Sequence, residues 1–407
     1  MKKINISLLI ILVSIITIVG FIGCKDPIHQ HSFATDWSKD STYHWKSATC
    51  EHSTQVSEKA KHNFGEWQVI KESSEETEGS KERTCTVCRY KATEVIAKLP
   101  HTHKFSEELT KDSKYHWYDT TCGHNEVLKK EEHTYTDGVC ICGLPKDFVF
   151  IKGLTIDVKE SLTPPSAVFI VGRKVTIQDL YVCNHEVTRG EYKSIMGNDP
   201  STADAYDKYG NKLTGDAVLN NPVNGTNWYA AIVYCNKLSI EQNFTPCYSL
   251  NGKTNPDEWG DVPEDNNSTW NAVSCNWEAN GYRLPTETEW EWIARGGEEY
   301  SYAGSDNLND VAWHSTNPIG TREVKSKEPN GYGLYDMSGN VFEWCWDFNG
   351  KIESDTPFDG IISDVERIIR GGNYFLIFTD ACRIAARSAS VPYNTPYSGF
   401  RVVRSAN

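Results

Sequence analysis

The cysteines and histidines in the first third of the chain occur at spacings that suit metal coordination. A Cys-x-His pair is followed further along by two closely spaced cysteines, and this order occurs twice. Zn²⁺ prefers thiolate and imidazole ligands, and a structural zinc site takes four of them in a tetrahedron. The sequence therefore predicts two zinc sites: Cys50, His52, Cys85 and Cys88 would form the first, and Cys122, His124, Cys140 and Cys142 the second.

Disulfide bonds are an open alternative for the same cysteines. Each copy of the pattern holds three cysteines, which also suits one disulfide within each copy and one bridge between the copies. The single residue between Cys140 and Cys142 is a tighter spacing than a zinc knuckle prefers. An even number of cysteines permits disulfides in an oxidising compartment but does not require them.

The metal-binding patterns belong to a repeat with an offset of 72 residues. Tyr43-His44-Trp45 recurs as Tyr115-His116-Trp117, and Cys50 recurs as Cys122. Such self-similarity indicates duplicated modules. Aromatic side chains in very small domains usually bury themselves, so these aromatics are expected to pack rather than bind. Residues 24–147 are therefore expected to form two Cys/His/aromatic repeats that act as a stalk or spacer.

From about Phe148 the sequence changes to mixed α/β patterning with motifs in a fixed order. Thr188 is a good N-cap for a helix, and Thr286 with Glu289 forms a capping-box signature. The ordered motifs are residues 184–192, 221–223, 226–238, 282–292, 330–344, 370–373 and 399–401. Buried bidentate framework pairs are expected among Arg283, Arg370, Arg387, Arg401, Glu289 and Glu343.

This ordered set resembles the formylglycine-generating-enzyme/sulfatase-modifying-factor family over residues 148–407. The resemblance implies an α+β, C-type-lectin-like domain, here preceded by the small Cys/His-containing repeats. It also implies a structural Ca²⁺ at the Gly-Asn-x-x-Glu-Trp turn, with oxygen ligands of the kind that Ca²⁺ takes. The matching ligands are the carboxylates of Asp336 and Glu343 and the carbonyls of Gly339 and Val341; a turn satisfied by its own hydrogen bonds is the alternative.

The chain departs from the oxidases of that family at their copper site. Those enzymes carry two cysteines, five residues apart, directly before the sequence Ala-Ala-Arg-Ser. Here these positions are Thr379 and Ile384, and Cys382 is the only thiol in the segment. One thiolate cannot supply the two-sulfur site that Cu(I) needs. We therefore expect no copper and no catalysis.

Residues 373–398 contain no Lys, Glu, Gln, Met or Trp, although the chain as a whole is rich in Lys, Glu and Trp. Every residue type in this segment can be encoded by replacing adenines of an AAC or AAT codon. A half-buried loop of Ala, Ser, Tyr and Asn would also lack long charged side chains, so composition alone leaves both explanations open.

With the copper pair missing, the chain also resembles the variable proteins of bacterial diversity-generating retroelements, including those of treponemal type. These have a C-type-lectin-like domain of the same family and a variable segment at the C-terminus. The resemblance implies a ligand-binding face in residues 373–398, where Tyr and Phe offer rigid contact area. The predicted variable positions are Tyr374, Phe375, Leu376, Phe378, Asp380, Ala386, Ser388, Ser390, Tyr393 and Tyr397. Cys382, Arg383, Ile384, Arg387 and Pro392 are expected to be scaffold.

The N-terminus has the features of a lipoprotein signal peptide. Lys2 and Lys3 precede an apolar run, residues 4–22, which ends before Gly23 and Cys24. Residues 1–23 are therefore predicted to be removed and Cys24 to be acylated. Stable anchoring needs more than one acyl chain, so a multiply acylated Cys24 would hold the protein on a membrane, as an outer-membrane surface lipoprotein. A membrane-spanning helix is the alternative, since about 20 apolar residues cross a bilayer.

Charge and composition narrow the classes of partner. The net charge is -14, and no cluster of Lys and Arg suggests contact with phosphate backbones, so no nucleic-acid partner is expected. The leading interpretation is a surface-displayed binding lipoprotein without catalysis that recognises a protein or glycan on another cell or host. The rival is an enzyme of the formylglycine-generating family that acts without the cysteine pair, for instance an iron oxygenase. Such a site needs two histidines and a carboxylate, and His185 and His314 are the only histidines after residue 147.

Overall fold

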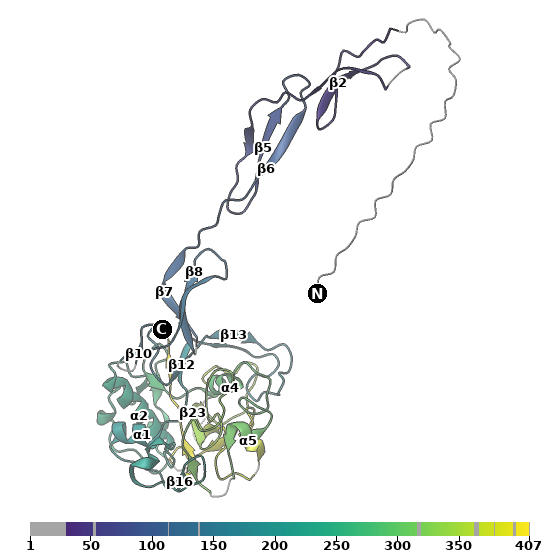
Figure 1. Ribbon diagram of the computed structural model, residues 1–407. Helices are drawn as coiled ribbons and strands as arrows, with labels where there is room; N and C mark the ends of the chain where they lie inside the picture. Colours follow the sequence, from purple (N-terminus) through teal and green to yellow (C-terminus); the bar gives the residue numbers. More distant parts are fainter. Residues whose placement is uncertain are drawn as a thin grey trace, which may run out of the picture. The chain divides into compact units, whose positions relative to one another are not determined.

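The computed structural model describes residues 30–406 except 52–53, 113, 137–138, 316–318, 362–365, 378 and 394–395 (Figure 1). The chain divides into two compact units, with the boundary between Thr102 and His103. The predicted signal peptide, residues 1–23, and Cys24 lie outside the described residues. In the part of the chain that is described, no helix has both the length and the apolar character to cross a membrane.

The first unit consists of two antiparallel sheets of three strands each. One contains β1 (Ser38–Lys39), β2 (Tyr43–Ser47) and β3 (Val56–Lys61), and the other β4 (Gln68–Lys71), β5 (Gly79–Thr84) and β6 (Lys91–Ile96). Most side chains of β3, β4 and β6 are exposed, including those of Val69, Ile70 and Val95. Among the described residues of 30–102, none belongs to a hydrophobic core cluster.

The second unit begins with a sheet of the same order as the first: β7 (Phe105–Lys111), β8 (Tyr115–Thr120) and β9 (Val127–Glu132), followed by the small hairpin of β10 (Tyr135–Thr136) and β11 (Val139–Cys140). We predicted a domain boundary after residue 147, whereas this compact unit begins at His103. Packing explains the difference. Leu144 lies in one buried cluster with Tyr181, and Lys111 donates to the Cys142 carbonyl at 2.6 Å while its ammonium lies over the Tyr181 ring.

The rest of the second unit is mostly sheet, with a few helices. One four-stranded sheet has the order β12 (Phe148–Ile151), β15 (Leu180–Cys183), β27 (Val403–Ser405), β19 (Tyr282–Arg283), and the other β25 (Ser388–Ser390), β24 (Arg367–Arg370), β23 (Phe342–Phe348), β26 (Ser398–Gly399). Four two-stranded pairs complete it: β13 (Leu154–Asp157) with β14 (Lys174–Ile177), β16 (Ala205–Tyr206) with β21 (Thr321–Arg322), β17 (Tyr248–Ser249) with β18 (Ser274–Cys275), and β20 (Ala312–Trp313) with β22 (Ser338–Gly339).

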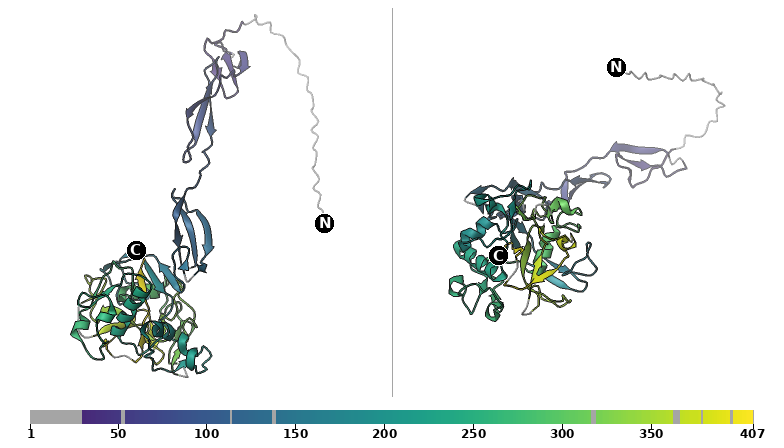
Figure 2. Two further views of the ribbon diagram at one scale, coloured as in Figure 1. Left: turned by 90° about the vertical axis from the view of Figure 1, so that its left-hand side faces the viewer. Right: turned by 90° about the horizontal axis from the view of Figure 1, so that it is seen from below.

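The helices are short and well capped. They are α1 (Arg189–Met196), α2 (Trp228–Glu241), α3 (Ser268–Asn271), α4 (Glu287–Arg295) and α5 (Leu308–Val311), with 3-10 turns η1 (Gly215–Asn220), η2 (Pro256–Glu258) and η3 (Thr379–Cys382). Thr286 forms the capping box that the sequence predicted, and Thr188, predicted as an N-cap, also forms one. In Figure 1, α1 and α2 lie to one side of β23 and α4 and α5 to the other, and the view from below in Figure 2 also separates the teal helices from the yellow C-terminal strands.

A buried ion pair joins the end of the chain to the centre of this unit. Arg401 donates to both carboxylate oxygens of Glu343, at 2.7 and 2.6 Å, and to the carbonyls of Cys183 and Tyr335. Trp290 donates to Glu343 as well, at 2.7 Å. Arg401 and Glu343 are each 0% exposed, so both charges depend on these partners. Arg401 and Glu343 were both predicted to belong to buried bidentate pairs, and the structure makes them partners of each other.

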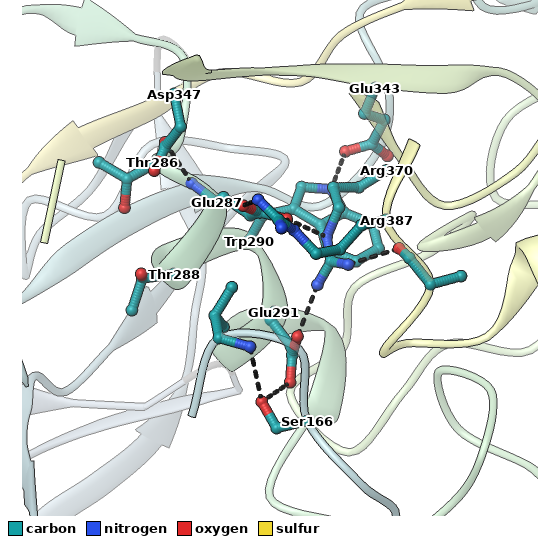
Figure 3. Close-up of polar contacts among 12 residues, drawn as sticks. Ser166, Thr286, Glu287, Thr288, Trp290, Glu291, Glu343, Asp347, Arg370 and Arg387 are labelled. Carbon is teal, nitrogen blue, oxygen red and sulfur yellow. Dashed lines mark hydrogen bonds and ion pairs between the residues drawn. The ribbon is translucent and has the colours of Figure 1, made fainter. Parts of the chain in front are cut away.

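Other charged residues on α4 extend this buried network. Arg283, which was predicted to belong to a buried pair, makes it with Glu289, at 2.6 and 2.8 Å. The remaining two arginines have partners that the sequence did not indicate: Arg387 binds Glu287 with two hydrogen bonds, and Arg370 binds Glu291 at 2.6 Å (Figure 3). Asp347 accepts from the Glu287 amide, and burial, with Glu287 nearby, raises the pKa of its carboxyl to about 8.

Replacement of Arg401 by alanine is expected to lower the free energy of unfolding by about 3 to 5 kcal/mol, because it leaves the Glu343 charge buried and unpaired. Arg383→Ala is the matched control: Arg383 pairs with Asp380 at the surface, where such a pair contributes about 0 to 1 kcal/mol. Thermal unfolding of both variants beside the wild type measures the difference. Equal melting temperatures for the two variants would contradict the framework role of Arg401.

Candidate functional site

The C-terminal segment 373–398 lies between fixed parts of one sheet. It leaves the end of β24 and returns to the sheet as β25, next to β24, and as β26, next to β23. Both edge strands of this sheet therefore come from the segment. The two central strands, β23 and β24, pair antiparallel in the core.

Hydrogen bonds to the core fix the backbone of this segment at several points. The Tyr374 amide donates to the Asn340 carbonyl at 2.7 Å, and the Ile384 amide donates to the Ser301 carbonyl at 3.0 Å. The Pro392 carbonyl accepts from the Trp228 amide, the first residue of α2, at 2.8 Å. Residues outside the segment thus fix the course of its backbone. Some side chains of the segment are exposed and others are buried.

The predicted variable positions differ in exposure. Phe375 is 47% exposed and Asp380 is exposed as well. Phe375 stacks on Tyr397, with ring centroids 5.3 Å apart and planes 12° from parallel. Phe378 lies outside the described residues. The half-buried members are Leu376, Ala386, Ser388, Ser390, Tyr393 and Tyr397, of which Leu376, Tyr393 and Tyr397 also pack against the core.

Two positions depart from the sequence-based selection. Tyr374 is only 5% exposed, because its ring meets the Tyr397 ring edge-on at 6.0 Å and its backbone is bound to Asn340. Tyr374 is therefore part of the base of the face rather than its surface. Ile377 was missed, yet it is 77% exposed. Its residue type also fits the codon pattern, which could have identified it; Ile384, expected to be scaffold, is indeed buried at 0%.

The positions that carry the copper-binding cysteines in related oxidases have other uses here. Ile384 is buried in the hydrophobic core, and Thr379 begins the 3-10 turn η3. Cys382 ends that turn and packs in a small cluster with Tyr302. Burial raises the pKa of the Cys382 thiol to about 11, so it is protonated at neutral pH. A single, buried and protonated thiol does not fit a two-thiolate copper site.

Both carboxylates that were predicted to bind calcium accept hydrogen bonds from the protein. Glu343 is bound by Arg401 and Trp290, as described above. Asp336 accepts from the Lys325 amide, and burial raises the pKa of its carboxyl to about 6. In the described residues, neither carboxylate belongs to a group of side chains close enough to share an ion. The turn that contains Gly339 and Val341 is held by hydrogen bonds within the protein, including one from the Val341 amide to Glu186. The calcium site stays a prediction, since Asp336 Oδ1 is buried and has no hydrogen-bond partner.

The two histidines of the lectin-like domain do not form an iron site with a carboxylate. His185 is buried beside Cys183 and lies 3.8 Å from Glu191, while His314 contacts Asn309. Within the described part of the chain, every group of histidine, cysteine and acidic side chains able to hold an ion lies before residue 143.

The structure groups the front cysteines differently from the prediction. Cys85 and Cys88 lie with two histidines from the preceding sheet, and Cys140 and Cys142 do the same in the second copy. The groups are His44, His62, Cys85 and Cys88, then His116, His133, Cys140 and Cys142. The two cysteines that we had assigned to the same sites have other neighbours: Cys50 lies 3.3 Å from His31, and Cys122 lies 3.5 Å from both His103 and His124. His52 is outside the described residues.

The second unit is similar in sequence to several known proteins. The chain is 34% identical over 255 residues to a protein named Chaperone protein LppX of Paenibacillus barcinonensis, a match that covers 57% of this chain and 82% of that protein. It is 34% identical over 162 residues to the formylglycine-generating enzyme of Streptomyces coelicolor, covering 34% of this chain and 52% of the enzyme.

A solved structure shares both fold and sequence with the chain. Treponema denticola variable protein 1 superposes with a TM-score of 0.54 and 33% identity, over 63% of this chain and 95% of that one. Residues 145–406 match the family described as Sulfatase-modifying factor enzyme 1-like domain. This match spans more than half of the sequence and contains both four-stranded sheets, the buried ion pairs and the C-terminal segment. The chain therefore belongs to the sulfatase-modifying factor enzyme 1-like (FGE-sulfatase) family.

Proposed function

We propose that this protein is a surface-displayed binding lipoprotein without catalysis, in which residues 373–398 form a ligand-binding face that a retroelement diversifies. The observation that carries the proposal is that the backbone of this segment is fixed by the core while some of its side chains are exposed. Its backbone is bound to Asn340, Ser301 and Trp228, while Phe375 and Ile377 project into solvent. Substitutions at the exposed positions change the surface without removing a contact of the core.

The chemical character of the face suits recognition of a protein or glycan. Phe375 stacked on Tyr397 presents a rigid aromatic surface, which gives contact area at low entropic cost. Ile377 adds apolar area, and Asp380 with Arg383 adds polar groups nearby in sequence. The likeness to a variable protein supports the same reading.

The enzymatic alternative has less support from the residues. The copper-binding pair is replaced by Thr379 and Ile384, and the one thiol in the segment, Cys382, is buried. The two histidines of the domain have separate partners, Glu191 and Asn309. What the family's enzymes use for oxygen chemistry is therefore missing from the matching positions.

A lipid anchor at Cys24 completes the proposal. Acyl chains on this residue would hold the mature chain on a membrane and leave the second unit free to meet a ligand. In cells fed a labelled fatty acid, the wild-type protein is expected to carry label and to fractionate with membranes. The Cys24→Ala variant should carry none, and Cys50→Ala, a cysteine change outside the signal, should retain it. A labelled Cys24→Ala variant would overturn the anchor assignment.

Diversification is tested by where variation occurs. Sequencing the last coding segment from many cells, together with the neighbouring DNA, should show changes only at adenines of a near-copy that lies beside a reverse-transcriptase gene. Exposed positions such as Ile377 should vary, and Ile384 should not. An invariant segment without a near-copy would contradict diversification.

Ile377 and Ile384 also provide a matched pair for stability, since they share a side chain but differ in exposure, 77% against 0%. Ile377→Ala should change the free energy of unfolding by less than about 0.5 kcal/mol. Ile384→Ala should lower it by about 2 to 5 kcal/mol because it leaves a cavity in the core. Thermal unfolding distinguishes them, and a large loss from Ile377→Ala would mean that this position is structural.

Catalysis is tested with a cysteine-containing sulfatase peptide. Copper-loaded protein, incubated with the peptide in air, is expected to leave the peptide mass unchanged, because one buried thiol cannot replace the two-cysteine site. The formylglycine-generating enzyme of Streptomyces coelicolor serves as the positive control under the same conditions. Formylglycine produced above a copper-only blank would refute the non-catalytic assignment.

A further inference from the structure

The described part of the first unit lacks the hydrophobic core that normally holds a small domain together. Among the described residues of 30–102, the buried ones are His44, Gly79, Cys85 and Cys88. Domains of this size gain little from burial alone and usually need disulfides or a metal for stability. Here, three of the four buried residues have side chains that bind metal ions.

These residues converge from both sheets of the first unit. His44 lies on β2 and His62 directly follows β3, while Cys85 and Cys88 sit in the turn between β5 and β6. The four ligand atoms all lie within 4.8 Å of one another, and His62 Nδ1 is 3.2 Å from Cys88 Sγ. His62 Nε2 lies 2.8 Å from the Asp40 carbonyl; donation there places the free lone pair on Nδ1, which faces the sulfur.

One buried nitrogen atom of this cluster has no hydrogen-bond partner. His44 Nδ1 is buried and makes no hydrogen bond, although an unpaired buried nitrogen costs about 1 to 3 kcal/mol. His44 is 4% exposed and its ring centroid is 5.5 Å from that of His62. A cation bound by both imidazoles would satisfy His44 Nδ1. It would also explain why the buried side chains among the described residues of this unit are those of a histidine and two cysteines.

The second copy has the same arrangement. His133 Nδ1 is 3.4 Å from Cys140 Sγ and 3.5 Å from Cys142 Sγ, and His116 Nδ1 is 3.6 Å from Cys140 Sγ. His133 Nε2 lies 2.9 Å from the Asp112 carbonyl, as His62 does from that of Asp40. The hydrogen bond that orients the histidine ring is thus the same in both copies.

The two cysteine turns also close in the same way, despite their different lengths. After the second cysteine, Arg89 and Gly143 both have a positive φ, 60° and 80°, and their amides donate to the carbonyls of Cys85 and Cys140. Lys39 and Lys111, one repeat apart, donate to the carbonyl of that second cysteine. The short spacing in the second copy therefore does not disrupt the turn that presents both sulfurs.

We propose that each of these clusters binds one Zn²⁺ through two imidazole nitrogens and two thiolates, at His44, His62, Cys85 and Cys88 and at His116, His133, Cys140 and Cys142. In a zinc tetrahedron with bonds of about 2.0 to 2.3 Å, neighbouring ligand atoms lie about 3.3 to 3.8 Å apart. The nitrogen–sulfur distances of 3.2 to 3.6 Å in the two clusters match this spacing.

The ligand set favours zinc over the alternatives. Calcium and magnesium take oxygen ligands, and these clusters offer none. A disulfide would use both sulfurs of a turn but leave the buried imidazoles, including His44 Nδ1, without a partner. Four protein ligands fill the coordination sphere of zinc, which indicates a structural site rather than a catalytic one. Each ion would join two sheets and supply folding energy that the exposed strands do not. This inference does not depend on the proposed function of residues 373–398.

The test measures metal in the mature chain, purified from cells without chelator. The Cys85→Ser/Cys88→Ser and Cys140→Ser/Cys142→Ser double variants should each contain one zinc ion fewer per chain than the wild type. Val87→Ser, in the same turn as the first pair but 40% exposed, should keep the wild-type content. Unchanged zinc in both double variants, iron in place of zinc, or disulfides within the two turns on peptide mapping would overturn the proposal.

A second measurement covers the case in which a double variant fails to fold. Wild-type protein stripped of metal under reducing conditions should bind Co²⁺ with a thiolate-to-cobalt charge-transfer band that Zn²⁺ then abolishes. Stripping should make residues 31–142 sensitive to protease while the melting transition of the lectin-like domain persists. A Co²⁺ complex without the thiolate band, or a front region as resistant to protease after stripping as before, would contradict zinc as its structural element.

Discussion

The fold of the second unit depends on the buried pair between Arg401 and Glu343. Glu343 lies on β23 and Arg401 just before β27, so the pair connects the two four-stranded sheets. Trp290 joins α4 to the same carboxylate, and Arg401 also binds the carbonyls of Cys183 and Tyr335. Buried charges cost several kcal/mol each when they lack a partner, so this junction is stable only with all its parts in place.

This junction is formed by buried residues that lie outside the segment 373–398. The polar network of α4 binds the end of β24 through Glu291 and Arg370, and it binds the C-terminal segment itself through Glu287 and Arg387. It does so through arginines whose geometry fixes direction as well as distance. Positions that face outward between them, such as Phe375, carry none of this network and contribute little to folding.

Sequence reasoning succeeded where local chemistry determines the result. The N-cap at Thr188 and the capping box at Thr286 could be predicted because their parts lie a few residues apart. Arg283 and Glu289 could be expected in buried pairs because they belong to one motif. The two-residue strands that build much of this domain, such as β19, are too short to show a periodicity. The exposed Ile377 and the buried Tyr374 also lie in an irregular loop, where no repeating pattern separates inside from outside.

The composition of the cysteine–histidine clusters could not be predicted from the sequence either. Spacing alone grouped Cys85 and Cys88 with the nearest Cys-x-His pair, whereas the structure joins them to His44 and His62. The choice depends on which face of β2 a histidine occupies and on how the two sheets of a module meet. Neither follows from distance along the chain, although the recurrence of His44 as His116 was a signal that an imidazole on that strand had a shared purpose.

Because Arg401 follows the segment 373–398, stop codons and frameshifts within that segment affect folding. A premature stop or a shift of reading frame within that segment removes both Arg401 and β27, and leaves Glu343 charged inside the core. Such products cannot complete the junction between the sheets. Native folding therefore requires that residues 373–398 have been translated completely and in frame.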